Sequence, residues 1–484
     1  MKRKEIAFLL LLTFAALLIH GYHPAAEDNE IYLPGIIKIL RPSFYPFGQN
    51  FFEAQDRLTL FPRLVAWSVR LTHLRLDWAL FLWHLASIFL LLLACWRIAS
   101  KCFATRAGPW CSVSMVAALL TLPVAGTALY ILDQYANPRS ISLFAVLFAV
   151  DAALEKKYLR TALWLILTAA IHPLMVVFGL VFIALLIPRM KIMSTATAGW
   201  AALFFVGFPF KYPSAAYWEC LQHRRNFFLL RWHWYEWLGI LAPLALLWWF
   251  IRIAKRKGCQ VFETLSRALF FLEVICLAGG LLIAIVPAFR IFAAYQPMRG
   301  LQLVYVCLII FSGGMLGESL LKNKPLRWLL LFVPLCAGMC FAQFQLFPGG
   351  QHVEWPGGAP KNPWVQAFVW IRANTPENAI FALDPNYMAL PGEDHQGFRA
   401  IAERSRLADT NKDWSVAVLY PWLPLADDCL AQTRAASGWK SFGANDFSRL
   451  EQTYGVTWVV LQQPNPAVPN CPYRNSAVEV CRLN

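Results

Sequence analysis

The sequence predicts an α-helical polytopic membrane protein of about eleven transmembrane helices with a C-terminal extracytoplasmic α/β domain. Of its 484 residues, 58% are hydrophobic and only 15% are charged, whereas soluble domains carry about 25% charged residues. The first 344 residues contain 32 Lys and Arg against 15 Asp and Glu, and the remainder contain 11 against 13. Because the bases of the first part fall in short loops between apolar runs, they indicate membrane topology and no nucleic-acid partner.

The apolar stretches are long enough to cross, or half cross, a hydrocarbon core about 30 Å thick. The positive-inside rule places the basic loops, such as Arg97 to Arg106 and Arg189 to Lys191, on the cytoplasmic face. The N-terminus is therefore expected in the cytoplasm and the C-terminal domain outside. The predicted helices begin near Ile6, Leu80, Ser112, Ile141, Leu159, Leu174, Thr195, Leu238, Leu269, Leu301 and Trp328.

The first apolar stretch follows Lys2-Arg3-Lys4 and has two interpretations, a retained anchor or a cleaved signal peptide. Under both interpretations, the loop that follows lies outside the cytoplasm. The predicted domains are residues 1–344 in the membrane, with a long first outer loop at 21–77, a Pro/Gly-rich linker at 345–362 and an external domain at 363–484.

Patterning predicts the elements of the external domain. The strands are expected at Ala379–Leu383, Val456–Leu461 and Val478–Arg482, and the helices at Pro363–Ala373, Gly397–Leu407 and Phe447–Tyr454. Cys471 and Cys481 are either a disulfide or two free thiols, since both are expected outside, where disulfides persist.

The first outer loop contains an amphipathic segment from Ile31 to Leu40. Its apolar residues recur with a helical period, and Lys38 and Arg41 lie near its C-terminal end, where the helix dipole favours cations. Such a helix is expected to lie along the membrane surface.

Three carboxylates, Glu27, Asp28 and Glu30, come directly before that segment. Ionisable groups at the hydrocarbon edge are costly to desolvate, so a cluster there indicates a function. One carboxylate could act as a general base on an acceptor hydroxyl or amine, and Asp28 with Glu27 could also hold a divalent cation. The alternative is structural, because Glu27 and Asp28 would also cap the helix that follows.

Cationic side chains are expected to face the same compartment. A lipid-linked phosphate leaving group requires cations near the outer interface, and Arg offers bidentate geometry for it. For any single Arg the alternative is snorkelling to lipid headgroups, and for the His it is satisfying carbonyls at a helix break. The candidates for binding the donor phosphate are Arg299, Arg290, Arg139, His172, Arg224 and Arg225.

These features resemble the GT-C superfamily of membrane glycosyltransferases, which includes protein O-mannosyltransferases, aminoarabinose-lipid A transferases and oligosaccharyltransferase catalytic subunits. The chain is most similar to bacterial members with an E-D-x-x-I-Y first loop, here Glu27, Asp28, Ile31 and Tyr32. The resemblance implies that Asp28 is catalytic or metal-associated, with Glu27 and Glu30 as rivals. No WWDxG-like motif is present, which argues against transfer to Asn sequons.

The expected function is therefore transfer of a sugar from a polyprenyl-phosphate-linked donor to an acceptor outside the bacterial cytoplasmic membrane. The expected partners are that donor and membrane lipid. The alternative is a non-catalytic envelope assembly protein or a transporter. Against transport, the two halves lack matching Gly/Pro-broken helices, the usual sign of inverted repeats.

Overall fold

The structure, a computed structural model, describes residues 2–187 and 213–483. The predicted helix near Thr195 and the basic loop from Arg189 to Lys191 lie outside these residues. The chain divides into two compact units. The helical unit comprises the described residues of Met1–Gly21, Leu82–Phe210 and Arg225–Ala342, and the sheet unit comprises those of Tyr22–Phe81, Lys211–Arg224 and Gln343–Asn484. The C-terminal residues therefore share a unit with most of the predicted first outer loop.

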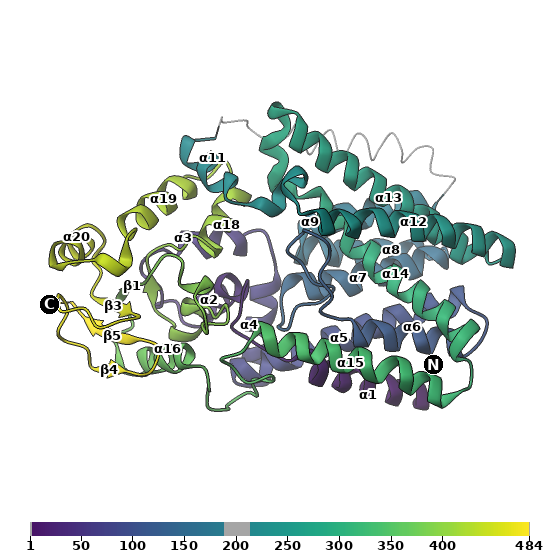
Figure 1. Ribbon diagram of the computed structural model, residues 1–484, viewed down its shortest axis with the longest axis horizontal. Helices are drawn as coiled ribbons and strands as arrows, with labels where there is room; N and C mark the ends of the chain where they lie inside the picture. The colour runs from purple at the N-terminus through teal and green to yellow at the C-terminus, as the bar shows by residue number, and fades with distance from the viewer. Residues whose placement is uncertain (1, 188–212, 484) are drawn as a thin grey trace. The chain divides into compact units, whose positions relative to one another are not determined.

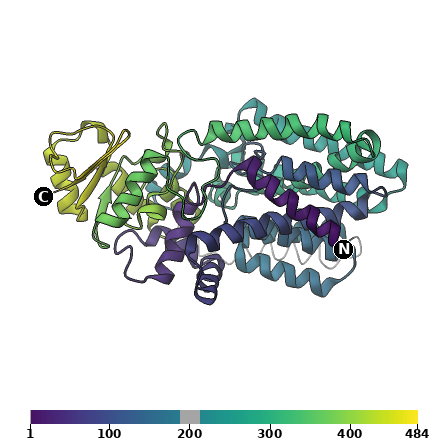
Figure 2. The same cartoon turned by 90° about the horizontal axis from the view of Figure 1, so that it is seen from below.

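Long apolar helices run alongside one another in the helical unit (Figures 1 and 2). Helices occupy ten of the eleven predicted stretches. They are α1 (Arg3–His20), α5 (Leu76–Cys102, whose first residues belong to the sheet unit), α6 (Ala107–Ala118), α7 (Pro138–Leu154), α8 (Tyr158–Ile171), α9 (Pro173–Leu186), α12 (Trp234–Lys257), α13 (Gln260–Ile285), α14 (Leu301–Leu316) and α15 (Pro325–Leu346).

Five segments of the described chain are long and apolar enough to cross a membrane, and α8 and α9 are shorter apolar helices. The protein is thus a multi-pass membrane protein, and the predicted count of about eleven spans is not confirmed. The five segments are α5, α12, α13, Pro297–Leu321 and α15. The segment Pro297–Leu321 consists of η4 (Pro297–Gly300), α14 and η5 (Gly317–Leu321). The other short helical turns are η1 (Arg225–Phe227), η2 (Leu229–Arg231) and η3 (Pro287–Tyr295).

Glycines allow α14 to approach α6 closely. A Cβ atom on Gly313 would lie 2.8 Å from the Ser112 Cα, and one on Gly317 would lie 2.4 Å from the Ala107 carbonyl oxygen. The Ser112 hydroxyl donates a hydrogen bond to the Ile310 carbonyl across this contact, at 2.7 Å. Small residues with an interhelical hydrogen bond are the usual means by which membrane helices associate.

The first segment of the sheet unit forms α2 (Asn29–Leu40), α3 (Asn50–Asp56) and α4 (Phe61–Thr72). The prediction that Ile31 to Leu40 lies on the membrane surface is wrong. Residues Asn29 to Ile37 are all buried, because α2 packs against α3, α4 and α17 (Phe398–Ala402). Its apolar residues therefore form protein core.

A five-stranded sheet with the order β2-β1-β3-β5-β4 organises the C-terminal residues (Figure 1). The strand β1 is parallel to β2 and β3, and β5 is antiparallel to β3 and β4. All three predicted strands are confirmed. The strands are β1 (Ile380–Ala382), β2 (Ser405–Arg406), β3 (Trp458–Leu461), β4 (Tyr473–Arg474) and β5 (Glu479–Arg482).

Helices and turns surround the sheet. The predicted helices Pro363–Ala373 and Phe447–Tyr454 are confirmed as α16 and α20, but Gly397–Leu407 is wrong, because α17 ends at Ala402 and β2 follows. Glu403 between them has φ 52°, a left-handed conformation that ends the helix. The elements are η6 (Tyr387–Ala389), η7 (Trp439–Ser441), α11 (Ala215–Gln222), α16 (Pro363–Asn374), α18 (Lys412–Leu419), α19 (Leu425–Ala435) and α20 (Ala444–Tyr454).

Candidate active site

The acidic segment before α2 pairs with a loop almost 370 positions away in the chain. Ala26 and Gln396 form an antiparallel bridge, and the Glu27 amide donates to the His395 carbonyl at 2.8 Å. Gly397 makes the close approach possible, since a Cβ there would lie 2.6 Å from Glu30 Oε2. Glu27 has φ 54° and His395 has φ 56°, so both residues of this pairing adopt a left-handed conformation. Such conformations concentrate at functional sites.

Lys412 holds the two exposed acids together. Its ammonium donates to Asp28 Oδ1 at 2.9 Å and to Glu27 Oε2. The Lys412 side chain is only 7% exposed, whereas Asp28 is 25% and Glu27 35% exposed. Burial alone would lower the pKa of Lys412, but the Asp28 and Glu27 carboxylates outweigh burial and raise it. Lys412 is therefore a permanent cation beside two carboxylates that solvent can reach.

Asp28 does not cap α2 in the expected way. It occupies the N-cap position, but its φ of −67° and ψ of −12° are helical and its side chain makes no capping hydrogen bond. The carboxylate is directed to Lys412 instead. The capping interpretation therefore does not account for this side chain.

Glu30 has a different environment, because it is fully buried in a network of ions. Arg406 donates to Glu30 Oε1 through Nε at 3.0 Å and Nη2 at 2.7 Å, and the Ala400 amide donates to Oε2 at 3.1 Å. Burial raises the pKa of Glu30, although Arg406 and Arg399 oppose the shift. Glu30 is therefore closed off from solvent, and its direct role in the chemistry stays a prediction.

Two aspartates complete this network and position Lys412. Asp413 accepts two hydrogen bonds from Arg399, at 2.8 and 3.0 Å. Burial would raise the pKa of Asp413, but Arg399 and Arg406 lower it. Asp409 Oδ1 accepts from the amides of Asn411 and Asp413, at 2.8 and 3.1 Å, in the turn that begins α18. The turn fixes the backbone from which Lys412 extends.

His395 contacts Glu27 at Oε1, the carboxylate oxygen that Lys412 does not bind. Its Nδ1 atom lies 3.5 Å from Glu27 Oε1, while 42% of the side chain is exposed. The adjacent Asp394 anchors the loop, because its carboxylate accepts from the Gly349 amide at 2.8 Å and from Asn362 Nδ2 at 3.1 Å. An imidazole held against a carboxylate, with another edge open, is suited to receiving a proton.

Of the six predicted phosphate-binding residues, Arg224 belongs to the same unit as the acids. Its guanidinium donates to the Thr410 carbonyl at 2.9 Å and to the Asn411 carbonyl, next to Lys412. Burial lowers the pKa of Arg224, and the nearby Asp409 and Asp28 charges oppose this. Arg224 therefore supports the Lys412 turn.

The other five belong to the helical unit. Arg139 is buried and pairs with Asp133 at 2.8 Å, and Arg225 makes two 2.8 Å bonds to Glu236. His172 caps α9 by accepting from the Met175 amide at 3.4 Å, whereas the structural interpretation had it satisfying carbonyls. Arg290 is exposed on η3 and Arg299 is half-buried on η4.

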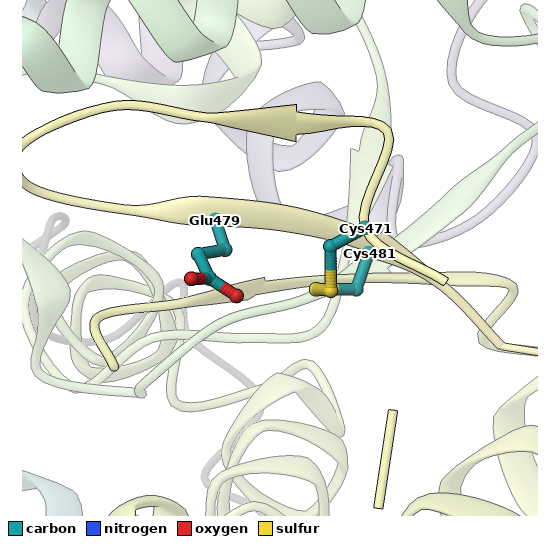
Figure 3. Close-up of side chains that lie close together, drawn as sticks. All are labelled: Cys471, Glu479 and Cys481. Carbon is teal, nitrogen blue, oxygen red and sulfur yellow. A yellow bond between two sulfur atoms is a disulfide. The ribbon is translucent and has the colours of Figure 1, made fainter. Parts of the chain in front are cut away.

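The acid pair does not fit a divalent cation with the ligands of its own unit. Lys412 already lies between Glu27 and Asp28. Within the described residues, one group of three possible ligands is close enough together, namely Cys471, Glu479 and Cys481. There the two cysteines form a disulfide, which answers the question left open by the sequence, and Glu479 pairs with Arg474 (Figure 3). Disulfide sulfurs are not thiolate ligands.

A cavity of about 920 Å³ lies on another face of α2, lined partly by Leu33, Ile37 and Leu40. Neither Glu27 nor Asp28 lines it. The acid pair and this cavity are therefore at different places.

Glu393 is a buried carboxyl near the acid pair that has no cationic partner among the described residues. Burial raises its pKa well above the ordinary value, and Asp394, Glu30 and Glu27 raise it further. The pKa of Glu393 is higher in the folded protein than in the unfolded chain. The free energy of unfolding therefore falls as the pH rises above about 4.3, the ordinary pKa of Glu. Glu393→Gln is therefore expected to stabilise the sheet unit at pH 8 and to change little at pH 4.5.

Amide hydrogen exchange of the full chain in detergent at both pH values measures this. Glu451→Gln, at a partly exposed position of α20, is the control, and its effect on hydrogen exchange should be the same at both pH values. If Glu393→Gln destabilised the sheet unit equally at both pH values, the claim that Glu393 is buried in its neutral form would be contradicted.

The sequence did not indicate Lys412, Arg399, Arg406 or His395 as members of the site. The available signal was the density of charge in an otherwise buried region, with three Arg and two Asp from position 399 to position 413. Burying so many charged side chains in the core of a domain costs free energy of desolvation unless each charge is paired.

No protein-family model matches the chain, and no curated protein matches its sequence. Solved structures of the Archaeoglobus fulgidus oligosaccharyltransferase are similar. Its complex with an inhibitory peptide and a dolichol-phosphate gives a TM-score of 0.48 at 10% identity over 95% of this chain and 69% of that one. The form tethered to an acceptor peptide with an NVT sequon gives 0.47 at 12%, over 95% and 69%. The complex with Zn and sulfate gives 0.43 at 12%, over 93% and 67%.

These structures are of an oligosaccharyltransferase. Oligosaccharyltransferase catalytic subunits are among the members of the superfamily that the sequence resembles. Because every one of these TM-scores lies below 0.5 and every identity is 12% or less, no residue role or substrate is transferred from them.

Proposed function

We propose that the protein transfers a sugar from a polyprenyl-phosphate-linked donor to an acceptor on the extracytoplasmic side of a bacterial cytoplasmic membrane. The observation that carries the proposal is the acid pair. Glu27 and Asp28 stay partly exposed beside the nearly buried cation Lys412, soon after the first apolar helix. A structural ion cluster has no need of exposed carboxylates, and the network around Glu30 is the buried counterpart.

The proposed step is a displacement at the anomeric carbon. The acceptor oxygen or nitrogen forms a bond to that carbon, and the bond from the carbon to the phosphate oxygen breaks. The polyprenyl phosphate leaves with the electron pair, and a carboxylate takes the acceptor's proton. Asp28 is assigned as the base, because it sits at the N-terminus of α2, where the helix dipole keeps a carboxylate ionised.

Lys412 and His395 are assigned supporting roles. Lys412 fixes the two carboxylates, which would otherwise repel one another. His395, against Glu27, is assigned to receive the proton after transfer. Arg290 and Arg299 remain candidates for binding the donor phosphate, as the sequence predicts.

The direct experiment is transfer by the full chain reconstituted in liposomes. A set of polyprenyl-phosphate sugars with a radioactive sugar is supplied with an extract of envelope acceptors. Release of polyprenyl phosphate together with a labelled product supports the proposal. Failure of every donor, with the protein folded, favours the alternative of a non-catalytic assembly protein or transporter.

The orientation can be tested separately. Because the basic loops follow the positive-inside pattern, a reporter that is active only in the cytoplasm is expected to be inactive when fused after Asn484. The same reporter fused in the basic loop that includes Lys255 should be active. Activity after Asn484 would reverse the topology and remove the acid pair from the extracytoplasmic side.

A further inference from the structure

The α4 helix exposes a line of apolar side chains. Its core-facing residues are Phe61, Pro62, Val65 and Ala66. Leu60, Leu64, Trp67 and Leu71 follow one another at intervals of four, three and four, which places them on one face of a helix. Trp67 is 57% exposed and Leu71 is 81% exposed. An exposed apolar line of this kind marks an interaction surface.

The residues around this line are basic. Arg57, Arg63, Arg70 and Arg75 are all exposed, and no Asp or Glu occurs from Arg57 to Leu76. Just outside this range, Glu53 lies 3.8 Å from Arg57 and Asp77 lies 2.8 Å from Arg75. Such a helix matches the surface of a membrane. Its apolar face fits against the acyl chains, and the arginines beside that face fit the anionic headgroups. Each such basic residue near an anionic membrane surface contributes about 1 kcal/mol to binding.

The chain itself places α4 at a membrane surface. The helix ends at Thr72, and α5, a candidate membrane span, begins at Leu76. The 27 residues of α5 extend about 40 Å, which exceeds the hydrocarbon core of about 30 Å, so the first turn of α5 lies among the headgroups. Exposed Leu74 and Trp78 continue the apolar surface across the turn. Trp is the residue that favours this layer.

We propose that α4 lies in the membrane interface of the leaflet that α5 enters. Leu60, Leu64, Trp67 and Leu71 contact acyl chains, and the arginines contact the phosphates of anionic lipids. The interfacial helix of the first outer segment is thus α4, in place of the segment from Ile31 to Leu40. This inference does not depend on sugar transfer.

The test is photocrosslinking of the full chain in nanodiscs that contain phosphatidylethanolamine and phosphatidylglycerol. Benzoylphenylalanine replaces Trp67 or Leu71, and mass spectrometry identifies the adducts. Leu330, exposed on the candidate span α15, is the positive control, and Trp422, exposed in the sheet unit, is the negative control. Neither α4 position supports the core of the unit, so folding should be retained.

Lipid adducts are expected at both α4 positions, at a yield at least half that of Leu330 and at least ten times that of Trp422. Phosphatidylglycerol should be enriched in them above its mole fraction. Adducts to a second copy of the chain, or a yield equal to that of Trp422, would overturn the proposal. Lipid adducts without phosphatidylglycerol enrichment would overturn the role of the arginines.

Discussion

Asp28→Asn is expected to abolish sugar transfer while leaving the lipid-linked donor bound. The amide keeps the shape of the carboxylate, and its oxygen can still accept from Lys412, but it cannot take a proton. Removing a general base typically slows a reaction about 10²–10⁴-fold. Single-turnover transfer in liposomes, with donor binding measured on the same sample, separates the two effects.

Under the structural alternative, in which Asp28 only pairs with Lys412, the same substitution lowers stability and leaves the turnover of the folded protein unchanged. Asp446→Asn, in the first turn of α20, is the matched control, since Asp446 accepts from the Gly443 amide and an amide oxygen can do the same. Full turnover by Asp28→Asn would indicate that Glu27, and not Asp28, is the general base. Full turnover by both Asp28→Asn and Glu27→Gln would refute a general-base role for the pair.

Glu30→Gln is expected to destabilise the sheet unit by about 1–3 kcal/mol, because the amide has one acceptor oxygen for Arg406 and its NH2 group would leave the buried Ala400 amide without an acceptor. The neutral amide would leave Arg406 and Arg399 facing one another with only Asp409 and Asp413 as counter-charges. Hydrogen exchange of the α17 and β2 amides in the full chain reports the change locally.

Glu53→Gln provides the comparison for Glu30. Its partner Arg57 is exposed and lies 3.8 Å away, and pairs of this kind contribute about 0–1 kcal/mol. Normal exchange in Glu30→Gln combined with lost transfer would show that Glu30 has a chemical role after all.

Hydrophobic periodicity and turn residues predicted most of the fold. Asn362 and Pro363 mark the start of α16 correctly, because the Asn side chain accepts from the Trp364 amide and Pro occupies the first helical position. The strand β3 was visible as a continuous apolar run. These signals are local, so a single sequence contains them.

Which face of a helix is covered is not local information. The segments at α2 and α4 are both amphipathic and both precede the span α5. Only the packing of α2 against α17, more than 350 positions away, shows that α2 is core and α4 is surface. The charge pattern nevertheless favoured α4, because the chain from Arg57 to Leu76 contains four arginines and no Asp or Glu.

The candidate site was predicted in part for the same reason. The acids were recognised from their spacing and position, but Lys412 is 384 positions from Asp28. His395 and Arg406 likewise reach Glu27 and Glu30 only through the fold. Glu27, Asp28 and Glu30 look equivalent in sequence, and burial separates the first two from the third.

The central claim, that the Glu27–Asp28 pair acts on a lipid-linked sugar, is tested most directly by a structure of the full chain in nanodiscs with a non-hydrolysable polyprenyl-phosphate sugar. We expect the anomeric carbon close enough for an acceptor to lie between it and Asp28, with that acceptor within about 2.6–3.2 Å of the carboxylate. Lys412 should still hold Glu27 and Asp28. A donor bound with its sugar far from both carboxylates, or no binding at saturating donor, would contradict the account.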